Sequence, residues 1–222
     1  MLKAVLFDMD GVIVDTEPLH HKAYFRMFNE VNIDVSEELY QSFTGQSTIN
    51  ICKFLCHNFK LKYDSTELVM LKRKAFKDLF FNDPDLKLID GVRNLIEDYY
   101  YNNLTLILAS SASMNTINNV FSRFELDKYF KAKLSGADLK KSKPHPEIFI
   151  NAAIASGFNK ENCIVIEDST NGIRAAYDAK IYCIGYKSKH SKNQNYSLAN
   201  KVISNFSEIE YSKVSNLLVT KD

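Results

Sequence analysis

The sequence predicts an α/β protein: a doubly wound parallel sheet with an all-α segment inserted after its first strand. Three observations predict this class. Short apolar runs recur along the 222-residue chain, and they are continuous rather than alternating, as in strands that are covered on both faces. Helical patterns lie between the later runs, as in doubly wound sheets. Residues 16–84 break this rhythm, because they hold helical patterns and no strand-like run.

The expected core elements follow from these patterns. The pattern that begins near Pro146 and ends at Gly157 has the usual order of helix start and stop signals. The expected strands are residues 3–8, 104–111, 132–137, 163–169, 181–186 and 201–206. The expected core helices are residues 91–103, 114–124, 144–157 and 170–180.

The inserted segment is expected to be a separate helical domain. Its apolar residues recur at helical spacing, and turn-forming residues then lead the chain back to the sheet. The three helical patterns cover residues 19–31, 49–59 and 65–81. We therefore expect an α/β core of residues 1–15 and 85–222, and a helical domain of residues 16–84.

The bulk composition excludes several classes of partner. The net charge of +1 gives no general attraction to nucleic acid or to an anionic membrane. No apolar stretch reaches bilayer-spanning length, and the N-terminal run ends in acids where a signal peptide would continue its apolar core. We therefore expect a cytoplasmic protein with no nucleic-acid or membrane partner, and we expect a monomer.

The four cysteines fit a reducing compartment. Cys163 and Cys183 lie in strand-like runs, where a free cysteine acts as a small apolar residue. Cys52 and Cys56 are four residues apart on a helical pattern beside His57, so a metal pair is one interpretation. We favour a partly buried helix face, because no further cysteine or histidine cluster completes a metal site.

Polar residues that do not serve the core gather at the ends of the expected strands. In an open α/β sheet, ligands bind beyond the carboxyl ends of the strands. Four clusters fall there: Asp8 with Asp10, Ser110 with Ser111, Lys143, and Glu167 with Asp168. Their convergence at one edge carries the functional prediction.

These side chains match the needs of phosphoryl transfer. Asp8 and Asp10 are two residues apart, so on an extended backbone they point to the same side. Carboxylates this close stay ionised only when a cation joins them, and oxygen ligands select a hard metal such as Mg²⁺. A lysine and a serine hydroxyl nearby would hold a phosphoryl group, and a spare carboxylate would attack it.

Each cluster also has a purely structural interpretation. A lone pair of aspartates at a strand end is often a turn or a helix cap, and Glu-Asp-Ser at residues 167–169 would cap the next helix. Any one short motif is weak evidence. Four clusters in order, each at an expected strand end, are hard to explain by chance.

The segments "FDMDGVIVDTEP", "LASS", "KSKPHP" and "IEDSTNGIRAA" resemble the four motifs of the haloacid dehalogenase (HAD) superfamily. The subgroup resembled contains β-phosphoglucomutases and small-molecule phosphatases. The resemblance covers nearly the whole chain and implies a Rossmann-like core. It also implies a helical cap between the first motif and the rest of the core, where the all-α insert is expected.

The resemblance implies a role for each motif residue. Asp8 is the nucleophile that forms an aspartyl-phosphate, and Asp10 is the general acid that later activates water. Ser110 binds the phosphoryl group, and Lys143 balances the charge of nucleophile and phosphate. The metal site takes Asp8, the backbone carbonyl of Asp10, Glu167 and Asp168 as ligands of Mg²⁺. Such an acid pair argues against a dehalogenase, which needs no Mg²⁺.

The loop after the first strand is expected to bind phosphate as well. Met9, Asp10 and Gly11 offer backbone N–H groups, and Gly11 allows the tight turn. Ser111 offers a further N–H group at the second motif. Ser113 is either a helix cap or a phosphate contact, and we favour the cap.

The cap residues are expected to decide the substrate. Thr16 and Glu17 lie at the expected hinge, and Thr48 is near the cap position that resembles a substrate-binding site. In the family, a histidine at the position of His20 can couple cap closure to Asp10; the alternative is a polar helix surface. His21 is the weaker candidate, since adjacent helical residues face apart. Residues 72–74 are either a substrate contact or a solvated helix face.

One departure separates the two enzyme classes of the subgroup. β-Phosphoglucomutases tend to carry a cap arginine for a second phosphate, and residues 43–51 contain none. A hydroxyl does not replace that bidentate guanidinium. We therefore predict a Mg²⁺-dependent phosphatase acting through an aspartyl-phosphate on a small phosphorylated metabolite, a sugar phosphate by preference. The alternative is a β-phosphoglucomutase; an inorganic pyrophosphatase and a non-catalytic binding protein rank lower.

Overall fold

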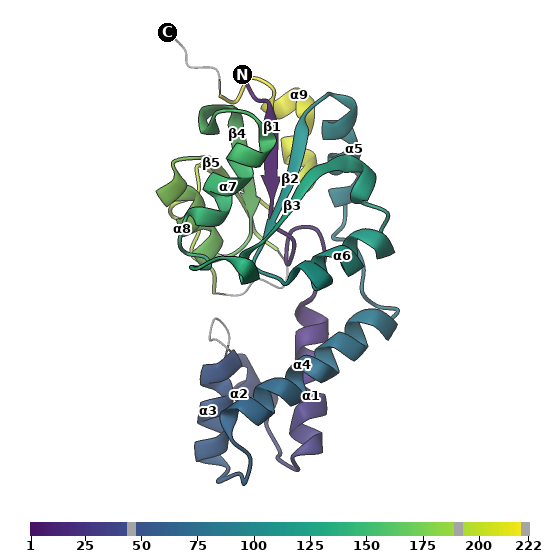
Figure 1. The fold of residues 1–222 in the computed structure, drawn as a ribbon, viewed down its shortest axis with the longest axis vertical. Coiled ribbons are helices and arrows are strands. Elements are labelled where there is room, and N and C mark those ends of the chain that lie inside the picture. Colours follow the sequence, from purple (N-terminus) through teal and green to yellow (C-terminus); the bar gives the residue numbers. More distant parts are fainter. Residues whose placement is uncertain (44–47, 189–192, 219–222) are drawn as a thin grey trace. The chain divides into compact units, whose positions relative to one another are not determined.

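The core is built on a six-stranded parallel sheet with the strand order β3-β2-β1-β4-β5-β6 (Figure 1). The structure is a computed structural model and describes residues 1–43, 48–188 and 193–218. The strands are β1 (Ala4–Phe7), β2 (Thr105–Ser110), β3 (Phe130–Ser135), β4 (Cys163–Glu167), β5 (Tyr182–Tyr186) and β6 (Lys201–Ile203). The predicted α/β class and its parallel sheet are confirmed.

Helices cover both faces of this sheet. The longer ones are α5 (Val92–Tyr101), α6 (Met114–Arg123), α7 (Glu147–Ser156) and α8 (Thr170–Ala179). The short ones are α9 (Tyr211–Val214), η1 (Asp127–Tyr129), η2 (Gly136–Asp138), η3 (Lys160–Asn162) and η4 (Phe206–Ile209). Leu6 packs in one core cluster with residues of α7 and α8. Phe7 points to the opposite face of the sheet, where its ring packs near that of Tyr99 in α5, with 6.3 Å between the ring centroids.

The edge strand β3 begins two residues before the expected position. Phe130 packs its ring against Phe7 (5.7 Å) and against Phe121 of α6 (5.0 Å). These contacts across the sheet add apolar burial at the start of the strand. A polar lysine follows at position 131, which is why the apolar pattern alone placed the start later.

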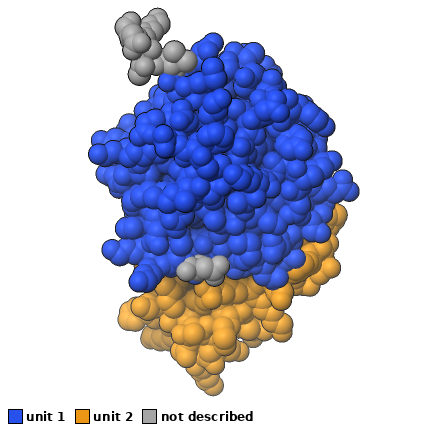
Figure 2. Space-filling model, turned by 45° about the horizontal axis from the view of Figure 1, so that its top comes forward, with its two compact units in different colours: residues 1–15, 87–222 blue, residues 16–86 orange. Residues whose placement is uncertain are grey.

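The chain divides into two compact units, which Figure 2 shows in blue and orange. Residues 1–15 and 87–222 form the core unit, and residues 16–86 form the second unit, called the cap here. The cap contains α1 (Glu17–Glu30), α2 (Glu37–Gln41), α3 (Thr48–Asn58) and α4 (Ser65–Asn82). The boundary on the C-terminal side lies two residues beyond the expected one.

Local signals explain where the cap helices begin. Pro18 occupies the first turn of α1, where its missing N–H costs nothing. Asp64 accepts hydrogen bonds from the N–H groups of Thr66 and Glu67, and Glu67 reaches back to the N–H of Asp64, which completes a capping box. Helix α2 is capped by Ser36 but buries no residue, so it left no apolar pattern to predict it.

The cap has an apolar core of its own, built from α1, α3 and α4 with the loops between them. A separate apolar core lets the cap hold its shape as a unit. Among the residues that the structure describes, no helix is both long and apolar enough to cross a membrane.

Candidate functional site

The site lies where the sheet topology reverses. From β1 the chain first adds β2 and β3 on one side, and then returns to add β4 on the other side. Ligands of doubly wound sheets bind at this switch point, beyond the carboxyl ends of the strands. Asp8 directly follows β1, and Glu167 ends β4. Phe7 is paired with Ile166 in the β1–β4 register, so the next residues along, Asp8 and Glu167, lie side by side.

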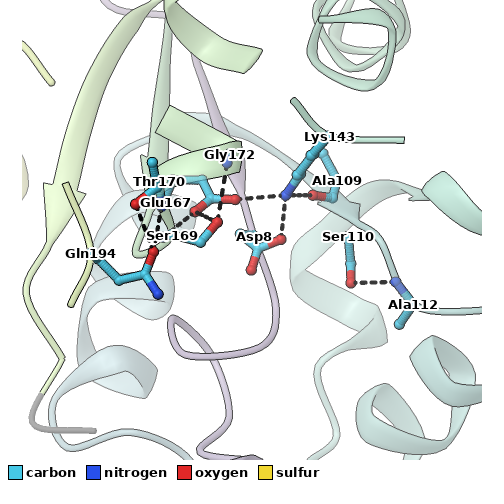
Figure 3. Close-up of polar contacts among 10 residues, drawn as sticks. All are labelled: Asp8, Ala109, Ser110, Ala112, Lys143, Glu167, Ser169, Thr170, Gly172 and Gln194. Atoms are coloured by element: carbon cyan, nitrogen blue, oxygen red, sulfur yellow. Dashed lines mark hydrogen bonds and ion pairs between the residues drawn. The ribbon is translucent and has the colours of Figure 1, made fainter. Parts of the chain in front are cut away.

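Lys143 joins the strand ends. Its side chain is 5% exposed, and its ammonium donates to three oxygen atoms (Figure 3). These are Oδ1 of Asp8 (2.5 Å), the carbonyl oxygen of Ala109 (3.0 Å) and Oε1 of Glu167 (2.8 Å). An ammonium has three donors, so each of them has a partner here. The lysine thereby links β1, β2 and β4 at the switch point.

Glu167 is held from both sides. While Oε1 accepts from Lys143, Oε2 accepts from the backbone N–H (2.7 Å) and the hydroxyl (3.0 Å) of Ser169. Ser169 is also the N-cap of α8 and accepts from the N–H of Gly172 (3.1 Å). A Cβ at position 172 would lie only 1.6 Å from Oε1 of Glu167. Gly172 is therefore required for the carboxylate to lie against the helix.

The carboxylates of Asp8, Glu167 and Asp168 form a candidate metal site. One ligand atom from each lies within 4.8 Å of the others, and all three residues are buried. Oε1 of Glu167 accepts one hydrogen bond, from Lys143, so it keeps a second lone pair for coordination. Gly11 makes room for Asp168, since a Cβ at position 11 would lie 2.1 Å from Oδ2 of Asp168. This donor set fits a hard cation.

The electrostatics also favour a cation. Burial raises the pKa of Asp8 well above its usual value, and the carboxylates of Glu167, Asp168 and Asp10 raise it further, while Lys143 opposes them. Burial disfavours the charge of Lys143, yet Asp8 and Glu167 raise the pKa of its ammonium above the usual value. One lysine does not neutralise this cluster of acids. A divalent cation would complete the charge balance and keep Asp8 ionised.

The loop after β1 folds back on itself. The carbonyl oxygen of Met9 accepts from the N–H groups of Ile13 (2.8 Å) and Val14 (3.0 Å), and the N–H of Gly11 donates to the carbonyl of Val14 (2.9 Å). Gly11 has φ +80°, a left-handed conformation that favours glycine. The Gly11 N–H that we expected to face phosphate is therefore engaged within the loop. Asp10 is half-buried and close enough to act on the pKa of Asp8.

The second motif lies at the end of β2. The hydroxyl of Ser110 is buried and accepts from the N–H of Ala112 (3.1 Å), so it lies inside the turn (Figure 3). Ser111 is exposed at the same turn. Ser113 caps α6, since its hydroxyl accepts from the N–H of Thr116 (3.3 Å). The expectation that Ser113 is a helix cap is confirmed.

The cap unit contains a polar cluster of its own. Nζ of Lys72 lies 2.7 Å from Nδ1 of His20, and the His20 ring stacks on Phe76 (4.3 Å). Lys72 is 5% exposed, and its ammonium also lies over the rings of Tyr24 (5.1 Å) and Phe76 (4.9 Å). Burial, together with the charge of Lys72, lowers the pKa of His20 to about 3. His20 is therefore neutral, with Nδ1 as the acceptor.

The other cap candidates differ in their surroundings. Thr16 is buried at the start of α1, and Glu17 is exposed beside it. Thr48 begins α3, and its hydroxyl hydrogen-bonds to Tyr24, whose pKa burial raises to about 12. His21 lies on the surface of α1, with its Nε2 3.0 Å from Oε1 of Glu37. Arg73 and Lys74 are exposed, whereas Lys72 is buried; residues 44–47 of the expected substrate stretch lie outside the described residues.

The two cysteines of α3 show no metal site. Cys52 is buried, Cys56 is half-buried, and both are free. Burial raises the pKa of each thiol, which favours the uncharged form over the thiolate that binds metals. Among the described residues, the acids at 8, 167 and 168 are the group arranged for a metal ion.

Several residues that hold the site in place were not predicted. They are the carbonyl of Ala109, the Ser169 N–H and hydroxyl as partners of Glu167, and Gly172. Gln194, which follows β5 in a polar part of the chain, is also involved: its Oε1 accepts from the N–H (2.7 Å) and hydroxyl (2.8 Å) of Thr170. Gly172, in the first turn of α8, was the available signal, because a glycine inside a helical pattern indicates close packing.

Comparisons with known proteins agree on the family. The model of the haloacid dehalogenase-like hydrolases matches residues 5–186. A phosphorylated carbohydrates phosphatase of Thermotoga maritima is 32% identical over 202 residues, which cover 89% of this chain and 90% of that protein. A 6-phosphogluconate phosphatase of Escherichia coli is 31% identical, covering 80% and 79%. The crystal structure of a β-phosphoglucomutase from Clostridium difficile superposes with a TM-score of 0.74 at 27% identity, covering 98% and 97%.

Proposed function

Since this chain belongs to the haloacid dehalogenase-like hydrolase family, we propose that it is a Mg²⁺-dependent phosphatase of small phosphorylated metabolites, with sugar phosphates as the preferred class. It is an enzyme that acts on phosphate esters, as its phosphatase and mutase relatives indicate. The observation that carries the proposal is the bridge from Lys143 to Asp8 and Glu167 at the switch point of the sheet.

Asp8 is the nucleophile of the proposed reaction. One of its carboxylate oxygens attacks the phosphorus of the ester, and the bond from phosphorus to the leaving oxygen breaks. Asp10 gives its proton to that oxygen, so the alcohol leaves uncharged. Asp10 then takes a proton from water, the water oxygen attacks the aspartyl-phosphate, and phosphate is released with Asp8 restored.

The phosphoryl group needs donors around it. Lys143 supplies a fixed positive charge beside Asp8, and Ser110 and Ser111 supply a hydroxyl and a backbone N–H at the end of β2. The backbone N–H groups of Met9 and Asp10 complete the set. Gly11 serves this set by shaping the turn and by admitting Asp168, and its own N–H stays with the loop.

The metal of the proposed site is Mg²⁺. Asp8, Glu167, Asp168 and the backbone carbonyl of Asp10 would hold it, since their oxygen atoms suit a hard cation. When bound, Mg²⁺ neutralises charge on the phosphoryl group and lowers the repulsion between that group and the nucleophile. Glu167 has a second role in any state, because it anchors Lys143.

We assign the choice of substrate to the cap. Thr16 and Glu17 belong to the hinge, and Thr48 and His20 are the proposed substrate-facing positions. Lys72, which is paired with His20, adds a cation to this group. It lies in α4 one turn before Phe76, whose ring stacks on that of His20. An ammonium suits a phosphate or a hydroxyl-rich sugar.

Hydrolysis is preferred over mutase chemistry for one reason. The mutase reaction returns a second phosphate to the nucleophile and needs a strong cap site for it, whereas residues 43–51 contain no arginine. A cytoplasmic monomer with no nucleic-acid or membrane partner remains our proposal for its setting.

A product assay separates the two activities. The protein is incubated with Mg²⁺ and a panel of sugar phosphates, nucleotides and pyrophosphate, and free phosphate is measured. We expect phosphate release from sugar phosphates. A second reaction holds β-glucose 1-phosphate with a trace of the 1,6-bisphosphate; glucose 6-phosphate that accumulates there without free phosphate would replace the phosphatase by the mutase.

A further inference from the structure

We propose that Gln194 is a positioning residue of the core site, which fixes the first turn of α8 and through it the acids that follow β4. This inference deepens the proposed function and rests on it. Gln194 lies far along the chain from every motif and belongs to the stretch after β5 that looks like a polar loop. The carboxyl end of β5 lies at the same sheet edge as the site.

The contacts of Gln194 with α8 are specific. Its side-chain Oε1 accepts from the backbone N–H of Thr170 (2.7 Å) and from the Thr170 hydroxyl (2.8 Å), as Figure 3 shows. The N–H of Asn195 donates to the same hydroxyl (2.8 Å). Thr170 is thus held by three hydrogen bonds from one short segment.

These bonds act on the residues that carry the chemistry. The N–H of Thr170 is fixed by Gln194, and the N–H of the preceding Ser169 is fixed by Glu167 (2.7 Å). Two consecutive peptide groups directly after Asp168 therefore have fixed orientations. Ser169 in turn sets the carboxylate of Glu167, which holds Lys143 (2.8 Å).

The segment that carries Gln194 is itself anchored to the sheet. The ring of Tyr196 lies against Gly185 of β5, where a Cβ would be 2.9 Å from it, and Gly185 is the register partner of Glu167. Asn200 exchanges two hydrogen bonds of 2.8 Å with the backbone of Cys183. The segment that carries Gln194 is therefore held against β5, and this positions the Gln194 side chain beside α8.

A simple helix-capping role does not account for this arrangement. Ser169 already caps α8 by accepting from the N–H of Gly172. The N–H of Thr170, in the first turn of a helix, is one that water usually satisfies. A buried metal ligand set loses affinity when the groups that orient it are removed, by about 10-fold to 100-fold. We therefore expect Gln194 to affect metal binding more than folding.

The test measures binding of Mg²⁺ alone by calorimetry, with melting temperature and hydrolysis of p-nitrophenyl phosphate as further readouts. Gln194→Ala should weaken Mg²⁺ binding about 10-fold. Gln194→Glu keeps an oxygen acceptor for Thr170 and should stay within about threefold of the wild type. The control Asn171→Ala removes an exposed side chain from the same turn and should leave the affinity unchanged.

A double variant isolates the link. Thr170→Val removes the hydroxyl, and Gln194→Ala with Thr170→Val together should weaken Mg²⁺ binding no further than Gln194→Ala alone, because both act on one contact. A Gln194→Ala protein that melts earlier but binds Mg²⁺ like the wild type would overturn the inference, as would a wild type that binds no Mg²⁺. Weakened Mg²⁺ binding in a protein that hydrolyses no phosphate ester would uphold the positioning role and reject the proposed function.

Discussion

Lys143 of the core and Lys72 of the cap both have buried side chains, but their partners differ in charge. Lys143 lies between the carboxylates of Asp8 and Glu167. Lys72 lies against the neutral ring of His20 and the aromatic faces of Tyr24 and Phe76. Two opposite charges thus contact the first ammonium, while a neutral imidazole and two aromatic rings contact the second.

This difference teaches what each lysine does. In the core, the lysine stabilises a cluster of carboxylates that would otherwise repel one another. Its removal should therefore lower the stability of the fold and also take away the positive charge beside the nucleophile. In the cap, the imidazole accepts one hydrogen bond and the rings interact with the cation at close range. The core lysine therefore holds the carboxylate of Asp8, while the cap lysine contacts side chains of α1 and α4 within the cap.

The largest effect is expected at Asp8, whose carboxylate accepts from Lys143. Asp8→Asn should lower phosphate release by on the order of 10³-fold or more, because an amide does not form the aspartyl-phosphate. The fold should survive, since burial already disfavours the charge of Asp8. Asp127→Asn, at an exposed ion pair with Lys133, is the matched control and should keep full activity. Normal turnover by Asp8→Asn would remove the nucleophile from the account.

Unfolding in urea measures the contrast between the two lysines directly. Lys143→Met leaves two buried carboxylates without their cation and should lower the free energy of unfolding by about 3–5 kcal/mol. Lys72→Met keeps an apolar side chain against the rings of Tyr24 and Phe76 and should cost about 1 kcal/mol or less. Equal losses in the two variants would show that the partners of these lysines do not differ as described.

A smaller effect is expected at Gly172, where α8 packs closely against the carboxylate of Glu167. Replacing a glycine inside a helix by alanine normally stabilises the helix by about 1 kcal/mol. Here the new methyl group would meet Glu167, so we expect a loss of about 2 kcal/mol in the free energy of unfolding and a lower activity. Asn171→Ala is the neighbouring control in the same turn. A stabilised Gly172→Ala protein with full activity would contradict the close contact.

The smallest effect is a pH dependence in the cap. The pKa of His20 is lowered from 6.5 to about 3 in the fold. A lowered pKa means that the unfolded chain takes up the proton first, so stability is present above pH 6.5 and is lost as the pH falls toward 3. Relative to His20→Gln, the wild type should lose about 1 kcal/mol in the free energy of unfolding per pH unit between pH 6.5 and 5. A difference that stays constant over this range would mean that His20 is not held neutral.

The core of the fold was predictable because its signals are local. Continuous apolar runs identified the strands, and their alternation with helical patterns identified the parallel sheet. The site followed from one further rule, since carboxyl ends of parallel strands share an edge. Helix α2 was not predicted because none of its five residues is buried, so it has no apolar pattern.

The supporting residues were beyond sequence reasoning for a different reason. The contact of Gln194 with Thr170 spans 24 positions, and that of Lys72 with His20 spans 52. Such pairs depend on how elements pack, and nothing in either local sequence encodes them. The Gly11 N–H shows the opposite failure: a local rule for phosphate-binding loops suggested a donor that the loop uses for its own turn.

The most direct measurement is to trap the phosphoryl group on the protein. p-Nitrophenyl phosphate with labelled phosphorus, whose leaving group needs no proton from Asp10, is mixed with excess Asp10→Asn enzyme and Mg²⁺. The reaction is quenched in acid, and the peptides are mapped by mass spectrometry. The account predicts one acid-stable, base-labile phosphoryl group on the side chain of Asp8. Release of labelled phosphate with no label on residue 8 at any time, or label on another residue, would contradict it.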